Sequence, residues 1–510
     1  MAKNPKALNI QMPVPQLEVV RPGKTIPAVQ SSLQTALTLF SLGLIDLLAL
    51  LLALGSGFAI RIYLIPSIFP NVAAAIPPNL YEHIWWIALT VLACLIHGGL
   101  YLKHMSFWQE AKRLVVATTM AFLIILAVIS LGKLGGEVSR FILVTSYLFV
   151  IFLLPLFRYL GKNALARIGW WNEPLLIMGA GEVGKKIAAA MQQEPFIGYK
   201  VVGFLEDNPF KRKKGVNIAG VSYCILGGFS EAEKVLQEYH INRIIIAAPG
   251  LPGPQLVELT TRLKHHAQSV MVIPDLIGIP VAGGEVEYLF NDQIVAYKTR
   301  NNLANPVNRV VKFLFDKLSG ILIFILALPL LLILALLVRL DSSGPAIYSG
   351  YRLGQKGKKF KCYKFRTMYL NNDQILEQYL NENPAAREEW EVYAKLRSYD
   401  PRVTRIGKYL RQYSLDELPQ IFNVIMGQMS LVGPRPYLPR EMVDMEDYAD
   451  TILMIDPGMT GLWQVSGRNE IDFNGRLELE ASYVRNWSIW LDISLLFRTF
   501  SVVLGRKGAY

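Results

Sequence analysis

The sequence has little charge and little cysteine. Only 18% of its 510 residues are Asp, Glu, Lys or Arg, whereas an average soluble protein has about a quarter. This shortage excludes an intrinsically disordered chain and a purely cytosolic enzyme as first interpretations. The three cysteines, Cys94, Cys224 and Cys362, have no CxxC or metal-ligand spacing, so they indicate neither a disulfide framework nor a zinc site.

The chain is instead rich in apolar and basic residues. Hydrophobic residues make up 52% of it, and 52 Lys+Arg against 40 Asp+Glu give a net charge of +12. The length of 510 residues predicts about three domains. The positive charge favours an anionic partner, which could be phosphate, acidic lipid or nucleic acid.

Four apolar blocks, at residues 35–54, 84–102, 115–131 and 141–157, are each long enough, or nearly so, to cross a bilayer core about 30 Å thick. Basic residues cluster in the tail, in the second connection and after the fourth block. The positive-inside rule therefore predicts four spans with both ends in the cytoplasm. Asp46 lies inside the first block, where we expect a neighbouring helix to satisfy its carboxyl; a functional role is the alternative.

A fifth apolar block, residues 318–338, has basic residues on both flanks and Pro329 near its centre. If it crossed the bilayer, one basic flank would lie outside, against the orientation rule. Proline lacks an N–H and kinks a helix. The block is therefore predicted to be a re-entrant helix that enters and leaves at the cytoplasmic face.

The middle of the chain alternates apolar strand patterns with helical ones, as in a doubly wound parallel sheet. Strands are predicted at 175–178, 201–205, 243–248 and 269–273. A GxGxxG motif (Gly179, Gly181, Gly184) follows the first strand, and Asp207 follows the second at the distance typical of a ribose-binding acid. We expect either nucleotide binding here or a scaffold that keeps the glycines for tight packing.

A membrane-bound sugar-nucleotide dehydratase is one function that such a middle segment allows. It would need a Tyr-x-x-x-Lys pair, and none of the 23 tyrosines is followed by Lys at the fourth position. This class is therefore disfavoured. A non-catalytic assembly or export partner, using its basic surface to hold lipid, is the other alternative.

The segment after residue 340 carries the densest basic stretch. Between Arg352 and Arg366, seven of fifteen residues are basic and none is acidic, which suits a pyrophosphate or an anionic lipid headgroup. The motif Lys-Phe-Arg-Thr-Met, which begins at Lys364, includes Phe and Met and so implies that part of this stretch is buried.

The sequence Ser-Leu-Asp-Glu-Leu-Pro-Gln at 414–420 opens a predicted helix that runs to Ile425. Ser414 and Glu417 have the spacing of a capping box, which is the purely structural interpretation. Asp416 is then left without a role, and two adjacent carboxylates repel unless a cation or substrate neutralises them. A Mg²⁺ bound by carboxylate and substrate phosphates would do so.

Two further motifs follow. Gly-Pro-Arg-Pro at 433–436 fixes Arg435 in a rigid turn that can aim a guanidinium at a phosphate. The glycine-rich loop 457–468 supplies more donors and a second basic group; its candidate binding residues are Thr460, Gln464 and Arg468.

With these motifs in their order, the region 307–510 resembles the bacterial sugar transferases, the monotopic polyprenyl-phosphate hexose-1-phosphate transferases. The upstream spans and glycine-rich domain resemble the long form of that family. Residues 383–390 and the ending Gly-Ala-Tyr look most like members that transfer galactose 1-phosphate. One departure is Ser343, where members often have proline.

The resemblance implies a reaction. Asp416 would attack the β-phosphate of a UDP-hexose and expel UMP, Glu417 would help to hold Mg²⁺, and undecaprenyl phosphate would then accept the sugar phosphate. Phosphates would be positioned by basic residues, of which the candidates are Arg352, Lys364, Arg366, Arg435 and Arg468. Galactose and glucose both remain open as the sugar.

The predicted fold class is a membrane α-helical bundle plus α/β. The predicted domains are a cytoplasmic tail (1–32), a four-helix membrane domain (33–160), a Rossmann-like domain (170–304), the re-entrant helix (307–340) and a catalytic α+β domain (341–510). The expected location is the bacterial inner membrane, with membrane lipid as a partner, no nucleic acid, and a homodimer as a plausible state. A stretch at 487–504 reads equally as an interfacial helix or a core helix, and 377–397 as a solvated helix pair.

Overall fold

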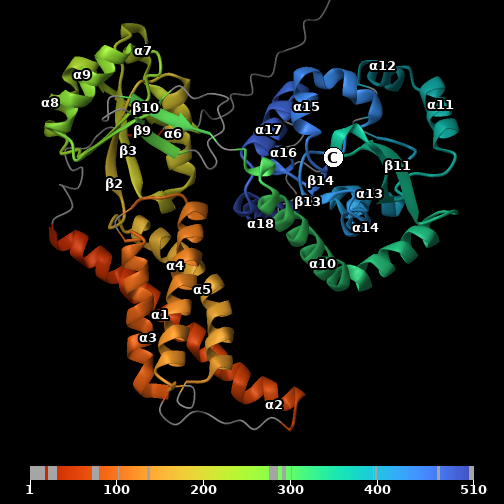
Figure 1. Cartoon of the computed structure of the whole chain (residues 1–510). Coiled ribbons are helices and arrows are strands. Elements are labelled where there is room, and N and C mark those ends of the chain that lie inside the picture. The colour runs from red at the N-terminus through yellow and green to blue at the C-terminus, as the bar shows by residue number, and fades with distance from the viewer. Residues whose placement is uncertain are drawn as a thin grey trace, which may run out of the picture. The chain divides into compact units, whose positions relative to one another are not determined.

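The computed structural model divides into two compact units, residues 1–275 and 276–510, and each is described by itself (Figure 1). The structure describes residues 18–20, 32–71, 80–101, 103–134, 138–274, 285–289, 294–299, 301–393, 396, 399–467 and 471–504.

Long apolar helices make up the first part of the first unit. They are α1 (Ser32–Ala59), α3 (Leu80–His97), α4 (Phe107–Leu131) and α5 (Arg140–Arg167), and a π-helical segment (Ile60–Leu64) and α2 (Ile65–Ile68) continue α1. In the described part of the chain, four helices are long and apolar enough to cross a membrane: residues 35–68, 107–131, 140–167 and, in the second unit, 306–341. At 1.5 Å per residue, α3 is only about 27 Å long. The first, third and fourth predicted apolar blocks are helical, and the second is helical as far as His97, where α3 ends. The protein is a membrane protein.

The four helices form a bundle in which α5 packs against α1 and α4, and α3 against α4 (Figure 1). Leu95, Leu114 and Ala121 are buried in its core. Large apolar side chains point outward instead: Phe40 is 70% exposed and Trp85 is 67% exposed. An apolar outer surface of this kind is stable in lipid and not in water.

A closed group of charged side chains lies inside this bundle. Arg158 donates to both carboxylate oxygens of Asp46, at 2.8 and 2.6 Å, and to Glu110 at 2.8 Å. Lys162 donates to both oxygens of Glu110, and the Tyr101 hydroxyl donates to Asp46. Two acids therefore balance two bases, and the prediction that a neighbouring helix satisfies Asp46 is confirmed.

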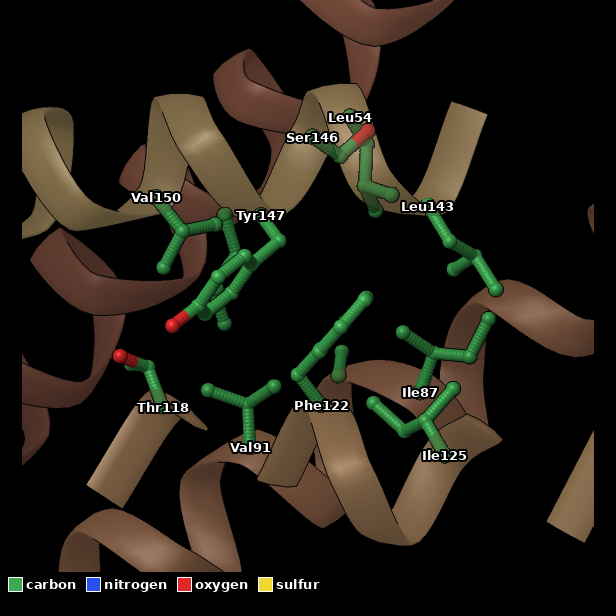
Figure 2. A pocket seen from close by; sticks show the side chains of 12 residues that line it. Leu54, Ile87, Val91, Thr118, Phe122, Ile125, Leu143, Ser146, Tyr147 and Val150 are labelled. Atoms are coloured by element: carbon green, nitrogen blue, oxygen red, sulfur yellow. The ribbon is translucent and has the colours of Figure 1, made fainter. Parts of the chain in front are cut away.

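A small cavity of about 50 Å³ lies among α1, α3, α4 and α5 (Figure 2). Its lining is mostly apolar, with Phe122, Ile125 and Val150 among the side chains that face it, and Thr118, Ser146 and Tyr147 add hydroxyl groups. The volume has room for a few water molecules at most, so the cavity is too small for a lipid tail.

The second part of the first unit is built on a parallel five-stranded sheet with the order β6-β3-β2-β7-β8. The strands are β2 (Glu173–Met178), β3 (Tyr199–Leu205), β6 (Ile225–Gly227), β7 (Arg243–Ile246) and β8 (Ser269–Val272). The first of these strands along the chain, β2, lies at the centre of the sheet. Strands β3 and β6 follow on one side of it, and then β7 and β8 on the other. All four predicted strands are confirmed as neighbours in one parallel sheet.

Alternate residues of β2 explain why helices cover both faces of this sheet. Leu175 and Ile177 pack on the side of α6 (Glu182–Gln193), while Leu176 and Met178 pack on the side of α8 (Ala232–Glu238) and α9 (Gly253–Lys264). A strand buried on both faces must be apolar at every position. A separate small sheet has the order β1-β5-β4, formed by Glu18–Val20, Val221–Tyr223 and Val216–Ile218. Helix α7 (Pro209–Lys214) directly precedes β4.

The second unit contains the fifth apolar block as α10 (Pro306–Asp341), one helix of 36 residues that continues through Pro329. Figure 1 shows α10 as two arms that meet at a bend. A proline inside a helix removes one backbone hydrogen bond and kinks the axis. Asn305 caps the start of α10, because its side chain accepts from the Val307 N–H.

Three two-stranded sheets and several short helices complete this unit. The sheets are the antiparallel pairs β9 (Glu285–Leu289) with β10 (Ile294–Lys298) and β11 (Ile347–Leu353) with β12 (Lys359–Phe365), and the parallel pair β13 (Ser430–Val432) with β14 (Gly458–Thr460). The helices are α11 (Asn372–Glu382), α12 (Pro384–Tyr393), α13 (Arg405–Gln412), α14 (Gln420–Met426), α15 (Ala449–Ile452), α16 (Leu462–Val465), α17 (Phe473–Arg485) and α18 (Ile489–Leu504).

The C-terminal helix α18 joins the core of this unit along one face. Asp492 and Leu495 are both 0% exposed, while Phe497 and Phe500 are more than half exposed. Residues 487–504 were predicted to form either an interfacial helix or a core helix. The buried face of α18, with Asp492 and Leu495, has the character of a core helix. The expected solvated helix pair is present as α11 and α12; the end of that pair, residues 394–395 and 397–398, lies outside the described residues.

Candidate functional site

The adjacent acids Asp416 and Glu417 lie in a single 3-10 turn, Leu415–Glu417, beside the end of strand β12. Lys364, from that strand, donates to a Glu417 carboxylate oxygen at 2.6 Å, and its Nζ is 4.0 Å from a carboxylate oxygen of Asp416. The Asp416 side chain is 15% exposed and that of Glu417 is 43% exposed. The structure therefore brings together the three residues that the sequence singled out from two separate motifs.

The capping-box interpretation of Ser414 is wrong. Ser414 adopts a left-handed conformation with φ +54°, and its side chain caps no helix. No capping box forms at this turn, and the Glu417 carboxylate accepts from Lys364. The helix predicted to open here begins only at Gln420, as α14. A non-glycine residue at positive φ is uncommon and often marks a functional site, so the turn presents the acids rather than starting a helix.

Sequence reasoning missed Arg411, which lies one turn before the acids, in α13. Its Nε donates to the Thr367 hydroxyl at 2.9 Å, which places a second cation near Asp416. Burial and then the Glu417 charge raise the pKa of Asp416 to about 6, while Lys364 and Arg411 oppose this rise. The carboxyl therefore remains mostly ionised at neutral pH.

Arg366 of the Lys-Phe-Arg-Thr-Met motif holds the chain where α10 ends. It is only 6% exposed and donates to the backbone carbonyls of Ser342 and Ser343. A Cβ on Gly344, whose φ is +114°, would come within 2.1 Å of its guanidinium. The expected burial of this motif is confirmed, since Phe365 is 3% exposed. The phosphate-binding task predicted for Arg366 stays a prediction, and its visible contact is a backbone anchor.

Strands β13 and β14 bring the Gly-Pro-Arg-Pro motif and the glycine-rich loop together. Ser430 pairs with Gly458 and Val432 with Thr460, and the Gly433 N–H donates to the Thr460 carbonyl. A Cβ on Gly461 would lie 2.2 Å from the Gly433 carbonyl oxygen. The glycines are required because the two backbones touch.

The remaining predicted binding residues are placed as follows. Arg352 lies near the end of β11, and the neighbouring Leu353 N–H donates to the Tyr437 carbonyl, two residues after Arg435. The hydroxyl of Thr460 bonds to that of Thr499 on α18 at 2.6 Å, so that side chain faces the core. Gln464 lies on α16. Arg468 lies outside the described residues.

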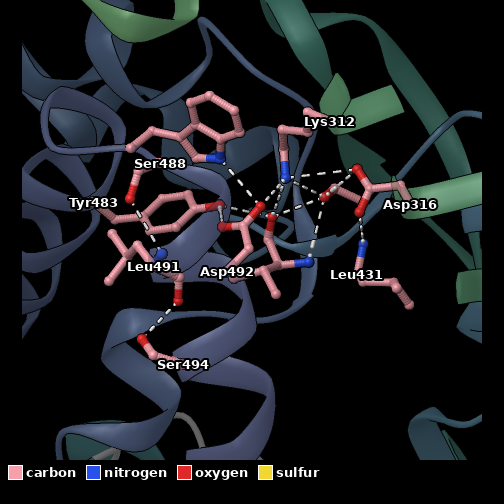
Figure 3. Close-up of polar contacts among 11 residues, drawn as sticks. Lys312, Asp316, Leu431, Tyr483, Ser488, Leu491, Asp492 and Ser494 are labelled. Atoms are coloured by element: carbon pink, nitrogen blue, oxygen red, sulfur yellow. Dashed lines mark hydrogen bonds and ion pairs between the residues drawn. The ribbon is translucent and has the colours of Figure 1, made fainter. Parts of the chain in front are cut away.

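A buried polar network ties the first turns of α10 to the rest of the unit (Figure 3). Lys312 donates to Asp492 of α18 and to the Ser430 hydroxyl, both at 2.8 Å. Asp316 accepts from the Ser430 hydroxyl and from the Leu431 N–H, and Tyr483 donates to Asp492 at 2.7 Å. The apolar helix and the segment that carries the motifs are therefore joined by charge-assisted hydrogen bonds.

The glycine loop of the first unit is brought to the end of β2 as predicted, but packing explains two of its glycines. A Cβ on Gly179 would lie 2.5 Å from the Ala247 carbonyl oxygen, and one on Gly184 would lie 2.0 Å from the Gly179 oxygen. Only Gly181 faces open space.

The acids after β3 make contacts within this domain. Asp207 accepts from the Phe229 N–H, and the Glu206 carboxylate accepts from the Ala180 N–H of the glycine loop at 3.1 Å. A carboxylate of this domain therefore accepts from one N–H of the glycine loop. Nucleotide binding by this domain stays a prediction.

The sequence predicts a magnesium ion at the acidic pair Asp416–Glu417, so the question is whether the residues there fit one. In the described ranges, no group of three or more His, Cys, Asp or Glu is placed to hold a metal. Mg²⁺ commonly uses one or two carboxylates and completes its shell with water and substrate phosphates. The repulsion between Glu417 and Asp416, which raises the Asp416 pKa, is what a cation would relieve. The residues present therefore fit Mg²⁺ held between protein and substrate.

Comparison with known proteins assigns both halves of the chain. Residues 307–506 match the family described as bacterial sugar transferase, and residues 99–274 match the one described as CoA-binding domain. An undecaprenyl-phosphate galactose phosphotransferase from Salmonella typhimurium is 38% identical over 424 residues, covering 80% of this chain and 84% of the relative.

Two further relatives have names from the same class of sugar-phosphate transferases. A UDP-galactose-lipid carrier transferase from Erwinia amylovora is 36% identical over 92% of this chain and 97% of its own length. A UDP-glucose:undecaprenyl-phosphate glucose-1-phosphate transferase from Klebsiella pneumoniae is 31% identical over 70% of this chain and 73% of its own. The three relatives cover 80%, 92% and 70% of this chain. The chain is therefore a membrane enzyme that belongs to the bacterial sugar transferase family.

Proposed function

We propose that the protein transfers a hexose 1-phosphate from a UDP-hexose to undecaprenyl phosphate and releases UMP, as the first membrane step of surface polysaccharide synthesis. The observation that carries this proposal is the acidic pair Asp416–Glu417, held beside Lys364 in the 3-10 turn that follows the left-handed Ser414. The names of the relatives supply the substrates. Galactose is the sugar that two of them name, and glucose is the alternative, because a third names it.

The reaction proceeds in two steps at Asp416. A carboxylate oxygen forms a bond to the β-phosphorus of the UDP-hexose, and the bond from that phosphorus to the bridging oxygen breaks, so that UMP leaves with the bond's electrons. An oxygen of undecaprenyl phosphate then attacks the same phosphorus and returns the free carboxylate. A carboxylate nucleophile of this kind splits one difficult transfer into two easier ones.

The neighbouring groups prepare Asp416 for this role. Partial burial strips water from the carboxylate, which makes it a stronger nucleophile, while Lys364 and Arg411 keep it ionised. Lys364 also lies where it can neutralise phosphoryl oxygens. When Mg²⁺ is bound, with Glu417 as its protein ligand, it offsets the charge of the diphosphate.

The membrane geometry suits a lipid acceptor. We propose that α10 is re-entrant and sets the acidic pair at headgroup depth on the cytoplasmic face. The bend of α10, Pro329 inside it and the basic residues on both of its flanks support this arrangement (Figure 1). A straight helix of this length would be about 54 Å long, far more than the bilayer core needs.

Two single cysteines test the re-entrant helix in a cysteine-free background. Val307→Cys and Leu340→Cys place a thiol at either end of α10, at positions that are 66% and 74% exposed. A re-entrant helix makes both thiols reactive toward an impermeant reagent from the same side of the membrane. Labelling from opposite sides would contradict the proposal.

The reaction is tested by UMP release from purified protein supplied with undecaprenyl phosphate, Mg²⁺ and a panel of UDP-sugars. Asp416→Asn keeps the size of the side chain but removes the nucleophile, so no UMP above background is expected. Asp373→Asn, at an exposed position in the first turn of α11, is the matched control and should keep full activity. Near-normal UMP release by Asp416→Asn would mean that no covalent intermediate forms there.

The metal is tested in the same assay. Excess chelator should stop UMP release, and added Mg²⁺ should restore it. Glu417→Gln should raise the Mg²⁺ concentration needed for half-maximal rate, because one charged ligand is lost. Full activity in excess chelator would remove Glu417 from its metal role while leaving the Asp416 mechanism intact.

A further inference from the structure

Two arginines from distant parts of the second unit lie over one indole ring, and a third arginine lies beside one of them. Arg476, on α17, has its guanidinium carbon 4.4 Å from the Trp463 ring centroid, and that of Arg435 lies 5.7 Å from it. Arg352 is brought beside Arg435 by the hydrogen bond from the Leu353 N–H to the Tyr437 carbonyl. We call Arg352, Arg435, Arg476 and Trp463 the arginine cluster.

The backbone around the cluster is held in place by a buried carboxylate. Glu480 lies one helical turn after Arg476 on α17 and is 1% exposed. It accepts from the Arg435 backbone N–H at 3.0 Å and from the Tyr437 hydroxyl at 2.6 Å. Glu480 therefore positions the turn that presents Arg435, and these two hydrogen bonds of its carboxylate go to a backbone N–H and a hydroxyl rather than to a guanidinium.

The cluster contains buried donors that the protein does not satisfy. Arg352 Nη1, Arg476 Nε and the Trp463 indole nitrogen are all buried, and none has a hydrogen-bond partner in the described part of the chain. Within the same described part, no carboxylate lies within ion-pair distance of the guanidinium groups of Arg352, Arg435 or Arg476. An unsatisfied buried donor costs about 1–3 kcal/mol, so three of them in one place indicate a missing acceptor.

Electrostatics point in the same direction. Burial, and next the charge of Arg435, lower the pKa of Arg352, and the same two causes act in the same order on Arg476. All three guanidinium groups nevertheless stay charged at neutral pH. Glu441 offsets part of this repulsion at Arg352, and Tyr437, Glu480 and Glu441 offset part of it at Arg476. An anion that enters among the three guanidinium groups would stabilise them further.

The cluster is separate from the acidic pair. On the β11–β12 ribbon, Lys364 pairs with Tyr348, whereas Arg352 lies four residues farther along β11 and pairs with Phe360. Four residues of extended strand span about 14 Å. The ribbon thus presents two basic sites, and the one at Lys364 already contacts the acidic pair Asp416 and Glu417.

From this geometry we infer that Arg352, Arg435, Arg476 and the Trp463 N–H form a second anion site, which binds a phosphate monoester. Guanidinium groups bind phosphate through paired N–H donors. The inference rests on the proposed function, in which two molecules carry such a group: the nucleotide that leaves as UMP, and the polyprenyl phosphate that accepts the sugar. Both share the phosphate chemistry that the site recognises.

The test measures binding without turnover. Full-length protein in detergent is titrated separately with inorganic phosphate, UMP and a short-chain polyprenyl phosphate. Arg476→Gln should weaken phosphate binding by about tenfold or more, because a hydrogen bond to a charged group is lost, and Arg476→Lys should recover part of the loss. The matched control is Arg387→Gln, at an exposed arginine of α12 whose side chain bonds only to Asn381 among the described residues.

Trp463→Phe is the second variant, and it keeps the ring while removing only the indole N–H. If no anion binds at the arginine cluster, Trp463→Phe leaves phosphate binding unaltered and only removes a buried N–H that has no hydrogen-bond partner among the described residues. If the inference holds, Trp463→Phe weakens phosphate binding even where Arg476→Gln fails to fold.

The ligand series identifies the source of the anion. If the variants bind only UMP more weakly, the site belongs to the nucleotide. If they bind only the polyprenyl phosphate more weakly, the site belongs to the acceptor. If they bind both more weakly, the two phosphates use the same site at different steps of the reaction. Unchanged affinity for all three ligands, within twofold, in both variants would overturn the inference. Protein that binds these ligands normally but never releases UMP would refute the proposed reaction and leave the anion site standing.

Discussion

Lys312→Met should destabilise the second unit strongly, because this lysine is the cation of a buried network (Figure 3). Its Nζ lies 2.8 Å from a carboxylate oxygen of Asp492 and 3.5 Å from one of Asp316. Asp492 is 0% exposed and Asp316 is 7% exposed. Methionine fills a similar volume but leaves two buried carboxylates facing each other without a cation.

The size of the destabilisation by Lys312→Met follows from the buried carboxylates that lose their cation. Removing one partner of a buried ion pair costs about 3–5 kcal/mol, mainly because the other charge stays buried and uncompensated. For a unit of this size, 1 kcal/mol shifts the melting temperature by about 2–4 °C. The expected loss in Tm is therefore roughly 6–20 °C. The double variant Lys312→Met/Asp492→Asn should regain part of this loss, because it removes one of the stranded charges.

The assay is thermal unfolding of the purified protein in detergent, followed by intrinsic tryptophan fluorescence. Lys317→Met is the matched control, on the same helix. Lys317 donates only to the carbonyls of Val424 and Ile425 in the described structure, so its loss strands no charge and should cost about 1 kcal/mol. Equal losses for Lys312→Met and Lys317→Met, or no recovery in the double variant, would refute the reasoning.

Two further predictions concern the segment around the arginine cluster. Burial raises the pKa of Glu480 to about 7, so between pH 4.5 and 7 the folded state holds a proton that the unfolded state has released. The free energy of unfolding should therefore fall by about 3 kcal/mol as the pH rises from 4.5 to 7. Thermal unfolding of Glu480→Gln should lack this dependence on pH. Gly461→Ala should cost about 1–3 kcal/mol in the same unfolding assay, because its Cβ would meet the Gly433 carbonyl at 2.2 Å. Gly350→Ala, whose Cβ would meet only the Tyr348 side chain at 3.5 Å or more, should be nearly neutral, and equal losses for the two alanines would contradict the packing argument.

Local pattern was sufficient wherever an element is defined by its own residues. The apolar runs of the sheet in the first unit, such as Leu175–Met178 within β2, are buried on both faces, so their sequence alone predicts parallel strands. The acidic pair was found for a similar reason, because adjacent carboxylates within a short motif stand out chemically.

Local pattern failed where the outcome depends on a distant partner. Ser414 and Glu417 have the correct spacing for a capping box, yet Lys364, more than fifty residues earlier, takes the Glu417 carboxylate instead. Arg411 and Arg476 sit in no recognisable motif, and each becomes relevant only because packing brings it to Asp416 or to Trp463. Charge clusters assembled from several elements cannot be read from spacing along the chain.

The charge group inside the helix bundle constrains how this protein is made. Asp46 enters with α1, Glu110 with α4, and Arg158 and Lys162 only with α5, so the partner of Asp46 is synthesised 112 residues after it. A charged side chain at the centre of a membrane helix costs about 2.5–3.5 kcal/mol, and Asp46 lies near the middle of α1. Glu110 lies in the first turn of α4 and so is not at the centre of its helix. Arg158 can offset the charge of Asp46 only after α5 has been made, so a chain that stops before α5 leaves this buried acid without its cation.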